Sequence, residues 1–261
     1  MIGVDDVLLS NGTQLRELHL FAGSGGGILG GMLLGHTTVC AVEIEPYCRK
    51  VLLQRQRDGI LPKFPIWDDV RTFDGKPWRG KVDCVCGGFP CTDLSSARTN
   101  SRSNGRQAGL GGKSSGLWFE MLRIVKEVAP ECVFIENSPN LRTKGLVEIL
   151  KGLSALGYNA KWCVLKSSYF GADHHRARMW ILAHTDIAQF KGGGLSSRIY
   201  EKDPIARGAN RREDKPKLER VANGLASGLD SNWARRLKAI GNGQDPQVAA
   251  LAWRILSDAR D

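Results

Sequence analysis

The sequence predicts an α/β protein built on a mostly parallel, doubly wound sheet. Short apolar runs typical of strands alternate with segments that have helical periodicity. Glycines and acidic residues follow the apolar runs directly, at the points where parallel strands end along one sheet edge. With 261 residues, 42% of them apolar, the chain can bury one sizeable core and hold a small appendage.

Strands and helices are expected to alternate along the chain. A strand at 15–22 precedes a helix that Ser24 and three glycines open and that ends near Leu34. A second strand at 39–43 precedes a helix from Pro46, which suits a first turn, to Arg57. Further strands are expected to end at 68–70 and to cover 81–86, 131–136, 162–165 and 179–183, with further helices at 116–128 and 146–156.

Charge and cysteine content narrow the functional class. A net charge of +10 and a pI of about 9.4 suit a polyanionic partner. Seven cysteines are an odd number, and the sequence opens without a signal peptide, so we expect a reduced, cytoplasmic protein. The apolar runs are all shorter than the roughly 18 residues of a membrane span.

Cys91 and Glu136 are the candidate reactive residues. The strand at 81–86 runs into Gly87-Gly88-Phe89-Pro90-Cys91, a turn that places the thiol as a nucleophile. The strand at 131–136 ends in Glu136, at the same expected sheet edge. A thiolate that adds to C6 and an acid that holds N3 suit attack on a pyrimidine ring. The alternative is a buried structural cysteine and an exposed strand-end acid.

The glycines after the first strand indicate a nucleotide-like ligand. Gly25-x-Gly27-x-x-Gly30 matches the dinucleotide fingerprint, and Glu43 lies where its ribose-binding acid is expected. A nicotinamide enzyme is therefore one interpretation. Cys91 and Glu136 on later strands have no role in simple hydride transfer, which favours another chemistry.

Five motifs in order make the chain resemble the DNA cytosine-5 methyltransferases, in particular short bacterial or phage members. They are Phe21-Ala22-Gly23-Ser24-Gly25-Gly26, Pro90-Cys91, Glu136-Asn137, Arg176-Ala177-Arg178 and Gly241-Asn242. The resemblance implies S-adenosylmethionine as cofactor. Phe21 and Ile44 would flank the adenine, Glu43 would bind the ribose and Asp69 the adenine amino group, while Trp118 or Leu117 would close the pocket. Core packing is the alternative for Ile44 and Trp118. The implied cofactor-binding set is Phe21, Ala22, Gly23, Gly25, Gly26, Glu43, Ile44, Asp69, Val70, Pro90, Trp118 and Asn242.

The same resemblance implies the roles at the base. Cys91 would form the covalent bond, Glu136 would hold N3 and Arg178 would contact O2, while the Phe89 carbonyl would meet the exocyclic amine. Arg176 would support Glu136 or the thiol. The target base must be flipped out of double-stranded DNA to be reached.

DNA contacts are expected in a loop with several basic residues after the nucleophile. Ser95, Arg98, Arg102 and Arg106 lie there, within or beside the segment 96–113. We expect a catalytic and cofactor-binding domain at 1–185, a short recognition region at 186–236, and a segment at 237–261 that returns to the catalytic domain. So short a recognition region predicts a recognition site of about two to four base pairs.

Some positions depart from the family pattern, namely Thr92, Ser138 and Asp173-His174. His174-His175 and the cysteines at 84, 86 and 91 lack the spacing of a tetrahedral metal site, so we expect no metal. We also expect a monomer that does not bind membranes. An RNA cytosine-5 methyltransferase and a catalytically silent DNA-binding module stay open as alternatives.

Overall fold

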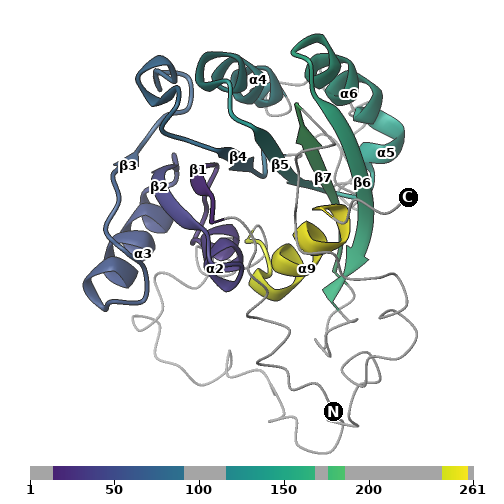
Figure 1. The fold of residues 1–261 in the computed structure, drawn as a ribbon. Helices are drawn as coiled ribbons and strands as arrows, with labels where there is room; N and C mark the ends of the chain where they lie inside the picture. The colour runs from purple at the N-terminus through teal and green to yellow at the C-terminus, as the bar shows by residue number, and fades with distance from the viewer. Residues whose placement is uncertain (1–13, 91–115, 168–175, 186–242, 258–261) are drawn as a thin grey trace, which may run out of the picture.

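The structure is a computed structural model that describes residues 14–90, 116–167, 176–185 and 243–257 (Figure 1). Its strands are β1 (Arg16–Leu20), β2 (Thr37–Val42), β3 (Ile66–Trp67), β4 (Cys84–Gly87), β5 (Cys132–Asn137), β6 (Asn159–Lys166) and β7 (Ala177–His184). Its helices are α2 (Gly26–Leu33), α3 (Pro46–Arg57), the 3-10 turn η1 (Lys76–Trp78), α4 (Leu117–Val128), α5 (Leu141–Lys144), α6 (Leu146–Ala155) and α9 (Pro246–Ser257).

The seven strands form one sheet with the order β3-β2-β1-β4-β5-β7-β6. Strands β1 to β5 pair in parallel, whereas β7 runs antiparallel to both β5 and β6. The predicted α/β class with a mostly parallel sheet is confirmed.

Helices cover both faces of the sheet, as Figure 1 shows for α4 and α6 on one face and α2 and α9 on the other. Alternation along the central strands creates these two cores, because successive side chains point to opposite faces. On β4, Val85 packs into the α4 core, whereas Cys84 and Cys86 pack into the core beneath α9. The two cores hold the central strands in place, and the candidate site lies where these strands end.

Several elements differ from the expectation, and the short helices η1 and α5 were not predicted. Strand β3 ends at Trp67, because Asp68 and Asp69 accept bonds from the backbone N–H groups of Asp69 and Arg71 and turn the chain. Helix α9 was not predicted as a helix, although Val248, Ala249, Ala252, Trp253 and Leu256 follow helical spacing and pack into the core. In the described part of the chain, every helix is too short or too polar to cross a bilayer.

Candidate active site

The carboxyl ends of four neighbouring parallel strands form the candidate active site. Leu20 of β1 pairs with Val42 of β2 and with Gly87 of β4, and Gly87 pairs with Ile135 of β5. The residues that come next on each strand, Phe21, Glu43, Gly88 and Glu136, therefore lie along one edge. This is where ligands bind in open α/β sheets.

Glu136 is a buried acid held by an arginine. Its Oε1 lies 2.7 Å from Arg178 Nε, which reaches it from β7. Burial raises the pKa of Glu136 above its usual value, although the charges of Arg178 and Arg176 and a hydrogen bond from Gln244 oppose that rise. The carboxyl group consequently takes a proton more readily than a surface glutamate does.

The two arginines of β7 differ in their partners. Arg178 donates 2.8 Å from Nη1 to the Ala177 carbonyl and has a partly exposed side chain. Arg176 Nη2 donates 2.5 Å to the Gly243 carbonyl, just before α9. Arg178 therefore lies between Glu136 and solvent, while Arg176 ties β7 to the chain that enters α9.

The turn after β4 is packed tightly against the acid. A Cβ added to Gly88 would lie 2.7 Å from Glu136 Oε2 and 3.1 Å from Gln244 Nε2, so a larger residue there would displace these two side chains. Asn137 Nδ2 donates to the Phe89 carbonyl over 3.3 Å and thereby connects the turn to β5. Pro90, the last described residue before Cys91, is exposed. The turn thus leads out of the core beside Glu136.

The loops after β1 and β2 are joined by Glu43. Its Oε2 accepts 2.6 Å from the Gly23 N–H and its Oε1 accepts 2.7 Å from the Glu45 N–H. Burial raises its pKa, and these two hydrogen bonds oppose the rise. Phe21, with φ 54°, and Gly23, with φ 55°, both lie in the left-handed region, a strained backbone for phenylalanine that is typical of binding sites.

Comparison with known proteins now identifies the family. A model described as C-5 cytosine-specific DNA methylase matches residues 15–226. The chain belongs to this family.

The sequence is similar to that of one viral and one bacterial methyltransferase over about two thirds of its length. The type II methyltransferase M.CviJI of Paramecium bursaria Chlorella virus IL3A is 35% identical over 171 residues, which are 65% of this chain and 43% of that protein. M2.BsuMI of Bacillus subtilis is 32% identical over 177 residues, which are 65% of this chain and 42% of that protein. The matches therefore span less than half the length of each of these relatives.

Solved structures share the fold of the methylase. The Dnmt2 methyltransferase of S. pombe aligns with a TM-score of 0.51 at 20% identity, over 70% of this chain and 58% of that chain. The Entamoeba histolytica methyltransferase EhMeth aligns with a TM-score of 0.52 at 15% identity, over 70% and 56%.

The other predicted donor-site residues, Ile44, Trp118, Asp69 and Val70, differ in how exposed they are and in what they contact. Ile44 is 57% exposed, so it is not a core residue. Trp118 is fully buried and contacts the Phe89 ring, with ring centroids 5.7 Å apart, and its place at the donor pocket stays a prediction. Asp69 is paired with Arg71 at 2.6 Å, which lowers the pKa of Asp69 through their hydrogen bonds. Val70 next to it is buried.

Most glycines of the α2 fingerprint contact protein. A Cβ on Gly26 or Gly27 would overlap Gln244, and a Cβ on Gly30 would lie 2.8 Å from the Ala249 Cβ. Helix packing therefore explains the Gly27-x-x-Gly30 spacing. The sequence reasoning missed Gln244, because its signal is a contact between residues more than 200 positions apart.

Several predicted residues lie outside the described residues. These are the nucleophile, the DNA-contacting set and the last donor residue, namely Cys91, Ser95, Arg98, Arg102, Arg106 and Asn242. Their roles stay predictions. Of the catalytic set, the structure brings together Glu136, Arg178 and Arg176.

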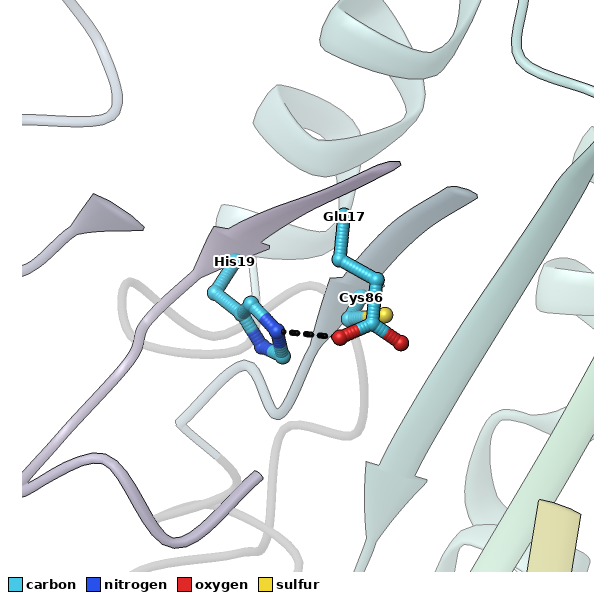
Figure 2. A group of neighbouring side chains, drawn as sticks. All are labelled: Glu17, His19 and Cys86. Carbon is cyan, nitrogen blue, oxygen red and sulfur yellow. Dashed lines mark hydrogen bonds and ion pairs between the residues drawn. The ribbon is translucent and has the colours of Figure 1, made fainter. Parts of the chain in front are cut away.

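A second buried group of charged side chains lies beneath α2 and α9. Glu17 Oε2 lies 2.9 Å from His19 Nε2, as Figure 2 shows, and Oε1 lies 2.8 Å from His36 Nδ1. Ligand atoms of Glu17, His19 and Cys86 lie within 4.8 Å of one another, a donor set that zinc can take. Both Glu17 oxygens are nevertheless engaged by histidines, so a network of buried hydrogen bonds accounts for the group.

Proposed function

We propose that this methylase transfers a methyl group from S-adenosylmethionine to C5 of cytosine in double-stranded DNA, through a covalent bond between Cys91 and C6. The observation that supports this most is the pairing of the buried Glu136 with the partly exposed Arg178, beside the turn that leads into Cys91. Membership in the methylase family favours the same reaction.

The loops after β1 and β2 fit the proposed donor. Glu43 is fixed by two backbone N–H groups, and its carboxylate oxygens retain lone pairs for the ribose hydroxyls. A Cβ position on Gly23 meets no atom within 4 Å, and the exposed Ile44 offers an apolar surface for the adenine. When bound, S-adenosylmethionine supplies an electrophilic methyl group on a sulfonium centre.

The residues of the chain then make C5 reactive. The Cys91 thiolate gives an electron pair to C6, and the displaced ring electrons are accommodated as Glu136 delivers its proton to N3. The raised pKa of Glu136, caused by burial, suits this transfer. Arg178, paired with Glu136 and partly exposed, stabilises charge at O2. C5 would then take the methyl group, and the sulfonium of the donor would leave as a neutral thioether. Loss of the C5 proton to water, return of the N3 proton to Glu136 and departure of the thiolate restore the aromatic ring.

The loop at 96–113 and the recognition region at 186–236 are proposed to contact DNA. Flipping the target base out of the duplex costs roughly a few kcal/mol, and Ser95 and the arginines after it would assist that step. The same proposal includes a recognition site of about two to four base pairs and three parts of the chain, 1–185, 186–236 and 237–261.

Bisulfite sequencing of a methylated plasmid reads the recognition site directly. A unique site of six or more base pairs would overturn the prediction of a short recognition site. The relatives' names, which describe them as type II methyltransferases, support a restriction-modification role, and a cytoplasmic location belongs to the same proposal.

The test uses a labelled donor with duplex DNA and, in parallel, tRNA under reducing conditions. We expect transfer to duplex DNA, loss of transfer in Cys91→Ser, and retention in the control Cys163→Ser, which changes a cysteine on β6. A duplex that contains 5-fluorocytosine should trap a complex that resists denaturant. Transfer to tRNA alone would replace DNA with RNA as the substrate, and trapping through Cys84 or Cys86 would refute the assignment of the nucleophile.

A further inference from the structure

Gln244 lies between the acid of the base site and the first helix of the donor site. It comes just before α9, and it donates a hydrogen bond to the Glu136 carboxylate. The Cβ position of Gly88 lies 3.1 Å from Gln244 Nε2 and 2.7 Å from Glu136 Oε2, so both groups face the same glycine. Arg178 pairs with the other oxygen, Oε1. Arg178 and Gln244 therefore both hold the Glu136 carboxylate.

The other atoms of Gln244 lie against the N-terminal turn of α2. Its backbone carbonyl lies too close to the Cβ position of Gly26 for any side chain there, and its Oε1 lies against the Cβ position of Gly27. The residues just before this turn, Gly23 and Gly25, form the loop whose N–H group contacts Glu43. One side chain thus connects the donor loop to the acid.

We infer that Gln244 is a positioning residue that holds Glu136 in register with the glycine-rich donor loop. This inference rests on the proposed methyl transfer. Glu136 can hold N3 only if its carboxyl group keeps one orientation, and two donors, Arg178 and Gln244, fix that orientation. An amide does this without adding charge. Its orientation follows from the contacts, because Oε1 faces Gly27 and Nε2 faces the acid.

The hydrogen bond from Gln244 should affect the pH dependence of turnover, which a purely structural role of Gln244 would not change. A donor to the carboxylate favours the ionised form, so removal of the amide lets Glu136 keep its proton to higher pH. Gln244→Met keeps the length of the side chain and removes the donor. Gln244→Glu keeps the shape but sets two carboxyl groups beside each other, which can share a hydrogen bond only when one of them is protonated.

The test measures turnover against pH together with donor binding by calorimetry, in the full chain. Gln247→Met is the matched control, because Gln247 is exposed in the first turn of α9. For Gln244→Met we expect kcat to fall about 10- to 100-fold, the donor Kd to change less than about threefold, and the Glu136 limb of the profile to move to higher pH. For Gln244→Glu we expect activity that recovers as the pH is lowered.

A Gln244→Met enzyme with the kcat and pH profile of Gln247→Met would overturn the inference. So would a loss of kcat with no movement of the pH limb in Gln244→Met and no recovery at low pH in Gln244→Glu, because a merely structural role gives that result. If Gln244→Met fails to fold, the pH behaviour of Gln244→Glu decides alone. Absence of methyl transfer by the unmodified chain would refute the proposed function instead, so the two failures are distinguishable.

Discussion

Arg178 on β7 and Glu136 on β5 form an ion pair of 2.7 Å across antiparallel strands. The acid comes from the parallel part of the sheet, and its partner comes from the strand that reverses direction. The antiparallel strand β7 therefore brings Arg178 next to Glu136, although the two residues are 42 positions apart in the sequence (178 − 136).

Arg178→Ala should lower kcat by about 100-fold or more, because charge at the base O2 and the orientation of Glu136 both lose their support. The Arg178 charge lowers the pKa of Glu136, so its removal should raise that pKa further. Turnover measured across pH checks both effects. Arg142→Ala, an exposed change on α5, is the control. Equal kcat values for the two variants would contradict the assignment.

Glu43→Gln should weaken donor binding by roughly 10- to 100-fold, since the substituted amide presents an N–H group to the Gly23 or Glu45 N–H and loses the charged acceptor for the ribose. Turnover at saturating donor should fall less, because Glu43 does not touch the base. Calorimetry with S-adenosylmethionine gives the affinity. An unchanged affinity would remove Glu43 from the donor site.

Glu17 should make stability depend on pH. Burial acts to raise its pKa, but the hydrogen bonds and charges of His19 and His36 outweigh it and lower the pKa from 4.5 to about 2. The folded pKa is depressed, so this contribution is full above about pH 4.5 and is lost as pH falls towards 2. Glu17→Gln should cost roughly 3–5 kcal/mol at pH 7.

Urea unfolding at several pH values measures this effect, with the exposed Glu148→Gln on α6 as control. Between pH 5 and pH 3, the unmodified chain should lose more stability than Glu17→Gln does. Parallel curves for the two proteins would show that the Glu17 network does not act on stability through its charge.

Gly30→Ala should destabilise the fold by about 1–3 kcal/mol, because its new Cβ would meet the Ala249 Cβ at 2.8 Å and the Pro246 carbonyl at 3.1 Å. Ala249→Gly removes one of these two atoms. In a double-mutant cycle, the pair should therefore recover part of the loss that Gly30→Ala causes alone. Strict additivity would show that α2 and α9 do not meet at this point.

DNA binding should fall steeply with salt. If Arg98, Arg102 and Arg106 contact phosphates, each replacement by alanine should reduce the slope of log affinity against log salt by about 0.9. Filter binding between low and physiological salt gives the slope. A nearly flat dependence in the unmodified chain would show that these arginines form a solvated surface.

The parts of the fold that depend on local sequence could be predicted. The strand that ends before Gly87-Gly88 and the turns at Gly23 and Gly25 depend on apolar runs and on backbone freedom that only glycine supplies. The presence of Glu43 and Glu136 at one edge followed from the rule that parallel strands end together.

Long-range contacts could not be predicted in the same way. Nothing near Gln244 indicates that it reaches Glu136, and nothing near His36 indicates that it binds Glu17 from another element. Nothing near Trp118 indicates that its ring packs against Phe89, a contact between residues that are distant in the sequence. The helical spacing in α9 was a usable signal that the sequence reasoning left unused.

The packing of α9 against α2 also has a consequence for protein synthesis. The ribosome makes residues 246–257 after every other described element, yet they supply the surface on which the glycines of α2 rest. A nascent chain that lacks α9 exposes that surface and holds Glu136 without Gln244. The arrangement of Glu136 and Gln244 described here is therefore complete only after translation has passed α9.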